Sequence, residues 1–222
     1  MYKNLIFDLD GTLLQTMTDI AHAVNEALSR CGYPFSYSVE EVQRIVGNGA
    51  NMLMKRALKE KGEDPEAFAA FKATMMPLYA EYQTEHTEPY EGITNALMFL
   101  QKEGRKFFVV TNKPHHLAQA VMAKCFPKGL FTLILGAQDG ISVKPDPFQV
   151  NRLISVYGLK KEETLYVGDS GVDVETGKNA EIDTALCLWG YGNYTPELKE
   201  QATYLLSHPG ELIKVAFGLM AM

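Results

Sequence analysis

Short apolar runs recur along the chain, and a longer stretch with helical periodicity follows most of them. The runs are long enough for strands and have the continuous apolar character of strands buried on both faces. They lie at 5–7, 107–110, 133–135, 165–167 and 184–188. The helical patterns lie at 92–103, 114–125, 147–157, 173–179 and 209–216. This alternation predicts an α/β fold with a doubly wound parallel sheet and helices on both faces.

Residues 17–86 interrupt the alternation, because no strand-like apolar run occurs among them. Four helical stretches are expected there, at 18–31, 39–46, 51–61 and 65–82, with Thr18 as the candidate N-cap of the first. We therefore expect a Rossmann-like core made of residues 1–16 and 87–222, with an inserted all-helical domain at 17–86. The connecting linkers would be 14–17 and 84–89.

Composition and charge narrow the functional class. The chain has 222 residues, enough for one core and a small insertion, and its formal net charge is -6, which argues against a nucleic-acid partner. No stretch resembles a membrane span or a signal peptide. The three cysteines are widely spaced and expected to be reduced. Together these features predict a cytoplasmic protein with no membrane partner, and leave both a monomer and a homodimer open.

Two aspartates follow the first apolar run. Ligands bind at the carboxyl ends of strands in parallel sheets, which is where Asp8 falls. Gly11 predicts that the strand ends near Asp8 and that the chain then turns and redirects Asp10, which would otherwise repel Asp8 on the same face. A simple Asp-Gly turn is the alternative. An EF-hand is excluded, because the sixth loop position is Leu13 instead of Gly and the twelfth is Asp19 instead of Glu.

Polar residues also follow the second and third runs. Thr111 and Asn112 can hydrogen-bond phosphate oxygens, and Pro114 suits the first position of a helix whose N-terminus favours anions. Capping of that helix by Thr111 or Asn112 is the alternative. Lys144 lies in a proline-stiffened loop, where lysines are usually exposed. It could instead pair with Asp8 and hold a phosphoryl oxygen.

The fourth run ends in Gly168-Asp169, and Asp173 follows shortly after. Asp169 can complete an oxygen cage with Asp8, and oxygen ligands without histidine or cysteine suit Mg²⁺ better than zinc. The alternative is that a loop aspartate caps the next helix. For Asp173, capping or indirect support of the site is the favoured role. The four segments have complementary chemistry, and each follows a predicted strand.

These segments resemble the four ordered motifs of the haloacid dehalogenase superfamily. The matching residues are Asp8-Leu9-Asp10-Gly11-Thr12-Leu13, Thr111-Asn112, Lys144-Pro145, and Gly168-Asp169-Ser170 with Asp173. The resemblance covers nearly the whole chain. The helical insertion, with IVGNGANMLMKRAL at 45–58, is similar to the phosphoglycolate phosphatase group. One departure is Gln15-Thr16, where the family often has Asp-Ser or Asp-Thr; it concerns the outgoing linker.

The resemblance implies a phosphatase that acts on a small organic phosphate. Asp8 would be the nucleophile and would form an aspartyl-phosphate. Asp10 would protonate the leaving group and then activate water. Thr111 and Lys144 would hold the phosphoryl group, with Asn112 also binding substrate.

The resemblance also implies a Mg²⁺ cofactor. Its ligands would be the carboxylates of Asp8 and Asp169 and the main-chain carbonyl of Asp10. Ser170 and Asp173 would support these ligands without binding the ion themselves.

The insertion carries a further candidate for substrate binding. Gly47-Asn48-Gly49 precedes a predicted helix, so its backbone amides could receive the distal end of a small anion. A simple turn between helices is the alternative. Lys55 and Arg56 are nearby, and we expect both on a solvated helix face.

The chemistry leaves the substrate open. The favoured activity is that of a phosphatase acting on 2-phosphoglycolate. The alternative activities are those of a sugar-phosphate phosphatase, a β-phosphoglucomutase or a pyrophosphatase. A phospho-acceptor or binding module would be a different class. It is disfavoured because such a module needs neither Asp10 as a proton donor nor a large insertion.

Overall fold

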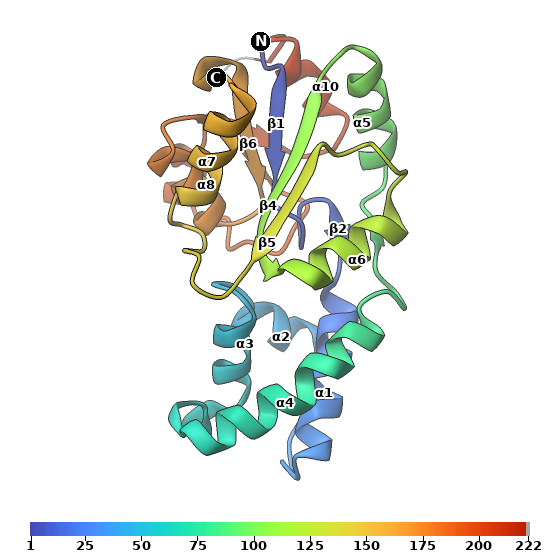
Figure 1. Ribbon diagram of the computed structural model, residues 1–222, viewed down its shortest axis with the longest axis vertical. Coiled ribbons are helices and arrows are strands. Elements are labelled where there is room, and N and C mark those ends of the chain that lie inside the picture. Colours follow the sequence, from blue (N-terminus) through green and yellow to red (C-terminus); the bar gives the residue numbers. More distant parts are fainter. Residues whose placement is uncertain (221–222) are drawn as a thin grey trace. The chain divides into compact units, whose positions relative to one another are not determined.

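The computed structural model describes residues 1–220, which fold as two compact units (Figure 1). One unit comprises Met1–Gln15 and the described chain from Pro89 onward, and the other is Thr16–Glu88. In the first, six strands form one sheet in the order β5-β4-β1-β6-β7-β8, and every neighbouring pair is parallel. The strands are β1 (Asn4–Phe7), β4 (Lys106–Pro114), β5 (Leu133–Ala137), β6 (Thr164–Gly168), β7 (Asp183–Cys187) and β8 (Tyr204–Leu206). The predicted doubly wound α/β fold is confirmed.

The strand order reverses next to β1. The chain passes from β1 to β4 and β5 on one side, and later from β6 to β7 and β8 on the other. The switch therefore lies between β1 and β6, which pair directly with Phe7 opposite Val167. Ligands bind at the carboxyl ends of the strands at such a point. Asp8 and Asp169, which follow these two strands, are thus placed at the expected ligand position.

Helices cover both faces of the sheet (Figure 1). All four residues of β1 are buried: Leu5 and Phe7 join one core cluster, and Ile6 joins the other. Strands buried on both faces explain the continuous apolar runs in the sequence. The first cluster contains side chains of α5 (Ile93–Lys102), α6 (His115–Cys125) and α10 (Glu211–Ala216). On the opposite face lie α7 (Phe148–Tyr157) and α8 (Gly171–Asn179).

Among the strands of the large sheet and the α-helices of this unit, β8 and α9 (Pro196–Gln201) are absent from the sequence prediction. Both are short, since β8 has three residues and α9 has six, and so neither shows a clear period. The sequence predicts that Pro114 is the first residue of a helix, and the structure places it one position before that. It ends β4 as the N-cap residue of α6, whose first helical residue is His115.

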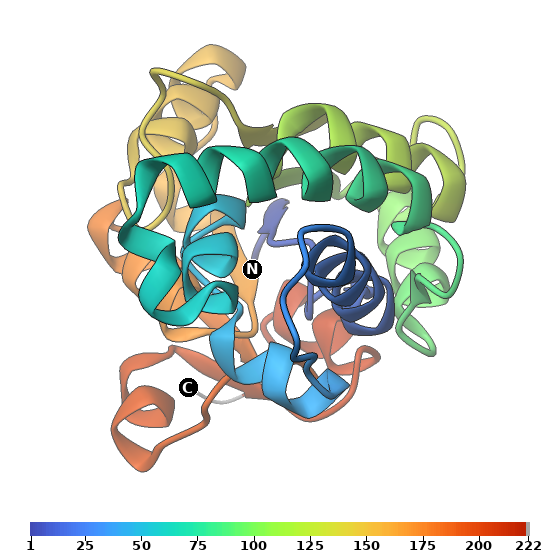
Figure 2. The same cartoon turned by 90° about the horizontal axis from the view of Figure 1, so that it is seen from below.

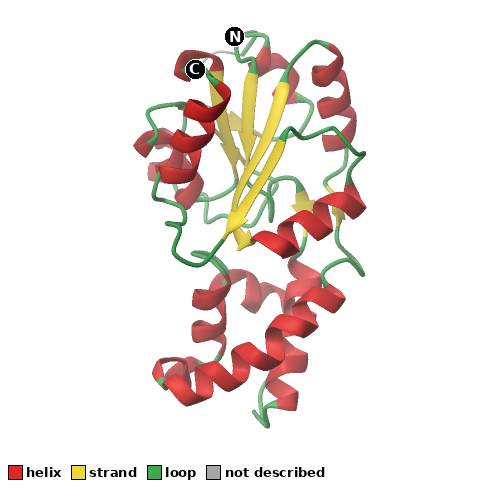
Figure 3. Ribbon diagram, in the orientation of Figure 1, coloured by secondary structure: helices red, strands yellow, loops and turns green. Residues whose placement is uncertain are grey.

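The second unit is helical (Figure 3). It contains α1 (Met17–Arg30), α2 (Val39–Ile45), α3 (Ala50–Ala57), a 3₁₀ helix (Lys59–Glu63) and α4 (Pro65–Tyr82). The long α4 packs against α1, and in the view from below α4 runs across the helical unit beside α1 (Figure 2). The strands β2 (Leu14–Gln15) and β3 (Glu88–Pro89) form a separate, short two-stranded sheet. Among residues 1–220, every helix is too short or too polar to cross a membrane.

Local capping sets several of these helix boundaries. Ser38 accepts a hydrogen bond from the Glu41 amide in a capping box, and Asp64 caps α4 ahead of Pro65. The expected cap at Thr18 is wrong. The α1 helix begins at Met17 after Thr16, so Thr18 lies within the first turn. Two hydroxyl residues in three positions made the sequence ambiguous at this boundary.

A buried carboxylate, Asp19, connects the beginning and the end of the helical unit. Asp19 is 1% exposed, and its oxygens accept hydrogen bonds from the amides of His86 and Thr87 and from the Thr87 hydroxyl. Burial raises the pKa of Asp19, but the bonds from Thr87 and His86 outweigh burial and hold it below its ordinary value. The ionised side chain thus ties the start of the insertion to its end.

Candidate active site

Four polar segments meet at the carboxyl edge of the sheet. Lys144 reaches this edge from the loop after β5. Its ammonium lies 2.9 Å from Asp8 Oδ1 and 2.6 Å from Asp173 Oδ1. Its side chain is only 3% exposed, so the usual exposure of a lysine between prolines does not apply here. Burial lowers the pKa of Lys144, but the carboxylates of Asp173 and Asp8 together outweigh burial and raise it well above its ordinary value. The site therefore contains a permanent, buried cation.

Asn112 fixes the loop that carries Lys144. Its side-chain oxygen accepts from the Lys144 amide at 2.9 Å, and its side-chain nitrogen donates to the Lys144 carbonyl at 3.0 Å. Both ends of the carboxamide are therefore engaged by main chain. The sequence interpretation placed this amide on substrate. The contacts that the structure shows are with the main chain of Lys144, which is far away in the sequence, so no local pattern reveals them; binding of substrate by Asn112 stays a prediction.

Three carboxylates gather beside Lys144. Oxygens of Asp8, Asp169 and Asp173 lie within 4.8 Å of one another. Burial raises the pKa of Asp8 to about 6; Lys144 lowers it and Asp173 raises it. Burial, followed by the charges of Asp173 and Asp8, raises the pKa of Asp169 well above its ordinary value. Raised pKa values show that these negative charges are incompletely compensated by the protein. The donor set is all oxygen, so the residues fit a hard divalent cation such as Mg²⁺.

Asp169 is held in a fixed orientation. Thr12 donates its hydroxyl to Asp169 Oδ1 at 3.1 Å, and the Tyr191 amide donates to Oδ2 at 2.7 Å. Neither partner has a role that could be assigned from the sequence alone. Thr12 belongs to the first motif, and Tyr191 follows the fifth predicted strand, at the edge where ligands bind. This position after a predicted strand is the one feature of the sequence that could have indicated that Tyr191 lies near the site.

Asp173 has two roles at once. As residue N3 of α8 it forms a capping box with Ser170, which confirms the capping interpretation. Its Oδ2 accepts from the Ser170 amide at 3.0 Å and the Ser170 hydroxyl at 2.6 Å, and its Oδ1 contacts Lys144. The helix N-terminus and Lys144 thus share one carboxylate.

Asp10 points to a different partner. The strand β1 ends at Phe7, and the chain then turns through Gly11, whose φ of 83° favours glycine. The Gly11 amide donates to the Leu14 carbonyl at 2.9 Å and closes the turn. This redirection of Asp10 is as the sequence predicts. The Asp10 carboxylate lies outside the cluster of three, and Lys113 Nζ approaches its Oδ1 to 3.1 Å.

Lys113 was missed at the sequence level. The predicted strand ended at residue 110, whereas β4 continues to Pro114 and carries Thr111 and Lys113 inward, both buried. Polar residues that follow an apolar run are typical of loops, so the sequence pattern predicts that the strand ends at the last apolar residue. The spacing of two between Thr111 and Lys113 was the available signal.

The Gly47-Asn48-Gly49 segment of the helical unit has positive φ at all three residues. Arg56 donates to the Ile45 carbonyl at 3.0 Å, the Gly47 carbonyl at 3.1 Å and Asn48 Oδ1 at 3.0 Å. The expectation that Arg56 lies on a solvated face is therefore wrong, because its guanidinium braces this loop. Its five donors make arginine suited to such a role. The binding of substrate by the loop amides stays a prediction.

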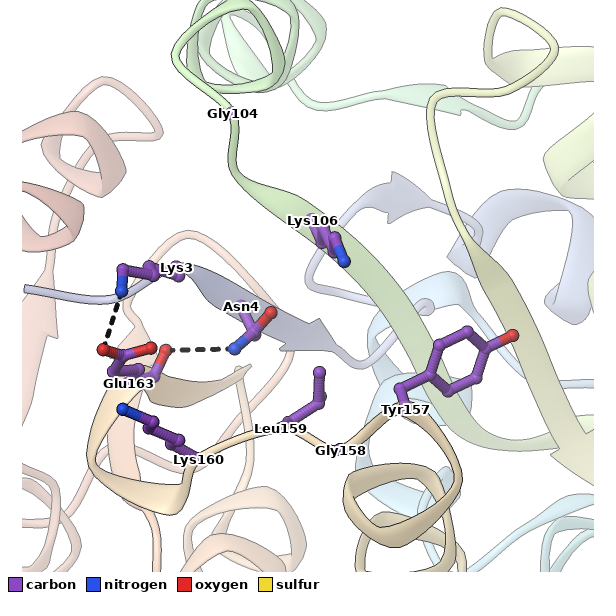
Figure 4. Close-up of a pocket in the computed structure, with 9 residues that line it drawn as sticks. All are labelled: Lys3, Asn4, Gly104, Lys106, Tyr157, Gly158, Leu159, Lys160 and Glu163. Carbon is purple, nitrogen blue, oxygen red and sulfur yellow. Dashed lines mark hydrogen bonds and ion pairs between the residues drawn. The ribbon is translucent and has the colours of Figure 1, made fainter.

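A separate hollow of about 240 Å³ lies at the opposite edge of the sheet, where β1 and β4 begin (Figure 4). Its lining includes Lys3, Lys106, Lys160 and Glu163, and Lys3 pairs with Glu163 at 2.8 Å. None of the candidate active-site carboxylates lines it. The candidate active site thus lies at the carboxyl ends of the strands, and the hollow lies at their amino ends.

The fold and the site together define the class of protein. The chain belongs to the haloacid dehalogenase-like hydrolase family, whose family model matches residues 5–187. It is 33% identical to a phosphoglycolate phosphatase of Aquifex aeolicus, with 95% of both chains covered. It is 34% identical to one of Cereibacter sphaeroides, with 98% of this chain and 99% of the relative covered.

A solved structure agrees with these relatives. A crystal structure of a predicted phosphoglycolate phosphatase from Haemophilus somnus superposes with a TM-score of 0.89 at 28% identity, covering 96% of this chain and 97% of the other. The superfamily suggested by the four motifs and the group suggested by the helical insertion are both confirmed.

Proposed function

We propose that this protein is a Mg²⁺-dependent phosphatase that hydrolyses 2-phosphoglycolate through an aspartyl-phosphate on Asp8. The observation that carries the proposal is the buried Lys144 ammonium, 2.9 Å from Asp8 at the switch point of the sheet. Phosphoryl transfer depends mainly on an in-line nucleophile and on charge neutralisation. The phosphoglycolate phosphatases of similar length support this choice of substrate. The cysteines of this protein form no disulfide within the described residues, which supports the proposal that the protein is cytoplasmic.

In the first displacement, an oxygen of Asp8 attacks phosphorus as the ester P–O bond breaks. The leaving oxygen takes a proton from Asp10, so the alcohol departs neutral. Lys144 reduces the repulsion between the Asp8 carboxylate and the phosphoryl oxygens, and Thr111 offers its hydroxyl to one of these oxygens.

In the second displacement, water attacks the phosphorus of the aspartyl-phosphate. Asp10 accepts a proton from that water, the Asp8–phosphorus bond breaks, and inorganic phosphate leaves. The site returns to its starting state after consuming one water. Dividing the reaction in this way allows one carboxylate to serve repeatedly as the nucleophile.

The carboxylates of Asp8 and Asp169 and the main-chain carbonyl of Asp10 would hold the cation. A bound Mg²⁺ would supply positive charge that stabilises the phosphoryl oxygens. Thr12 and the Tyr191 amide keep Asp169 oriented for this task.

We further propose that residues 17–86 act as a cap that excludes water and selects the leaving group. The Gly47-Asn48-Gly49 amides would bind the distal end of the substrate. The loop is braced by Arg56, which supports a recognition role because a rigid loop loses little freedom on binding.

Mg²⁺ should raise the melting temperature more at pH 7.5 than at pH 5. The folded pKa of Asp8, about 6, is raised from 3.8, so its contribution to stability is full below pH 3.8 and is lost as pH rises through 6. At pH 7.5 the ionised Asp8 is free for metal, whereas protons compete at pH 5. Saturation at a hundred times the Kd would add about 2.7 kcal/mol.

The matched control for this experiment is Asp169→Asn, which removes one proposed ligand and retains the shape of the side chain. Its melting temperature should respond to Mg²⁺ much less than that of the wild type. A wild-type-sized response in the variant would exclude Asp169 as a ligand.

A panel of phosphate esters tests the function itself. Purified protein with Mg²⁺ should release phosphate from 2-phosphoglycolate with a higher kcat/KM than from hexose phosphates or pyrophosphate. Isomerisation of a hexose phosphate would instead indicate a mutase. No phosphate release from any ester, or a stable phosphorylated form without turnover, would reject the phosphatase.

A further inference from the structure

Lys113 is a second buried cation at the carboxyl edge of the sheet. Its side chain is 1% exposed, and its ammonium lies 3.1 Å from Asp10 Oδ1 and 3.5 Å from Oδ2. A lysine is almost never buried to this extent unless it is paired, and a carboxyl oxygen of Asp10 is a partner here. The Asp10 side chain is 20% exposed, so it can meet both Lys113 and a ligand.

The main chain holds Lys113 in this inward position. Pairing of β4 with β5 is irregular between Val110 and Pro114, and within this stretch the Lys113 amide donates to Thr111 Oγ1 at 3.3 Å. On β5, Gly136 lies against the same segment. A Cβ at Gly136 would lie 2.5 Å from the Lys113 carbonyl oxygen, so the close approach of the strands requires glycine there.

The two buried lysines have different partners. Lys144 contacts Asp8 and Asp173, whereas Lys113 contacts Asp10. Asp10 itself follows the turn at Gly11 and lies outside the cluster of carboxylates. Its orientation therefore needs a support other than the cluster, and the ammonium of Lys113 reaches both of its oxygens.

We propose that Lys113 is a positioning residue that holds the Asp10 carboxyl group at the leaving-group oxygen of the substrate. The inference rests on the proposed phosphatase function, in which Asp10 gives its proton to that oxygen as the P–O bond breaks. Proton transfer requires hydrogen-bond reach between donor and acceptor, so a displaced Asp10 would lose this contribution even though the nucleophile remained in place.

The proposal predicts a dependence on the leaving group. An alkoxide such as that of 2-phosphoglycolate is a strong base and needs a proton in order to depart. The nitrophenolate of p-nitrophenyl phosphate is a weak base and departs without one. Loss of Lys113 should therefore slow the first ester and largely spare the second. A purely structural defect would slow both equally.

The experiment compares kcat/KM for these two esters in Lys113→Met, because kcat/KM covers only the steps up to departure of the leaving group. We expect a fall of roughly 10²-fold for 2-phosphoglycolate and less than about 3-fold for p-nitrophenyl phosphate, in line with the usual contribution of general acids. Lys113→Arg keeps the charge and should recover part of the lost activity. Lys106→Met, an exposed lysine on the same strand, is the matched control and should leave both values unchanged.

A double variant tests the connection to Asp10. Lys113→Met added to Asp10→Asn should cause little further loss on 2-phosphoglycolate, because the group that Lys113 positions is already disabled. Equal losses on both esters in Lys113→Met, or additive losses in the double variant, would overturn the proposal. If Lys113→Met does not fold, the ester comparison in Lys113→Arg decides, and equal losses there would overturn it too. A wild-type protein inactive on every ester would instead reject the phosphatase function.

Discussion

Asp8→Asn is expected to reduce phosphate release by a factor on the order of 10⁴ or more, the scale seen when a catalytic nucleophile is removed. The carboxamide has the same shape as the carboxylate but does not attack phosphorus. The fold should persist, because the change removes a buried charge whose pKa is already raised by burial. Lys144 keeps Asp173 as its countercharge at 2.6 Å.

Two measurements check this result. Phosphate release from 2-phosphoglycolate gives the rate, and mass spectrometry after acid quenching reports the phosphorylated enzyme, which should be present in the wild type and absent in the variant. Glu103→Gln, an exposed carboxylate at the end of α5, is the control for loss of one negative charge. Retained turnover in Asp8→Asn would contradict the assignment of the nucleophile.

Lys144→Met is expected to abolish turnover and to lower the free energy of unfolding by about 3–5 kcal/mol, the usual range for breaking a buried ion pair. Methionine has similar length but leaves Asp8 and Asp173 buried together without the ammonium between them. The loss should be smaller at pH 5 than at pH 7.5, because the uncompensated carboxylates take up protons as the pH falls. Urea unfolding at both pH values measures it.

The control for this variant is Lys3→Met, which breaks the Lys3–Glu163 pair. Its two side chains are 62% and 25% exposed, so solvent screens the pair and the expected loss of stability is much smaller than for Lys144→Met. Combining Lys144→Met with Asp173→Asn should restore part of the stability and none of the activity. A double variant as unstable as the sum of the two single variants would show that the residues do not act as a pair.

Much of the fold could be predicted from local patterns. The five predicted strands are all present, and the helical stretches of the insertion match α1 to α4 within a few residues. Buried parallel strands and amphipathic helices have distinct periods, and each is read over neighbouring residues. The short β8 is the counterexample, because three residues carry no period and its position is set by pairing with β7.

The candidate site was predictable only as residue types and approximate positions. Asp8, Lys144 and Asp169 could be named because their motifs follow successive strands, and the topology of such sheets collects strand ends at one edge. The partners of these residues could not be named. Asn112 and Lys144 are 32 residues apart, and Arg56 and Gly47 are 9 apart across a turn. Pairings of this kind depend on how the elements pack.

The order of strands and helices, the candidate nucleophile and the oxygen-rich chemistry were determined by the sequence itself, because each is carried by a few adjacent residues. Only the tertiary structure decided which charges meet. It buried Lys144 between Asp8 and Asp173, and it turned Lys113 inward against Asp10. The physical reason is that burial and Coulomb interactions depend on distance in space, and a charged residue in a sequence does not show which opposite charge the fold will bring beside it.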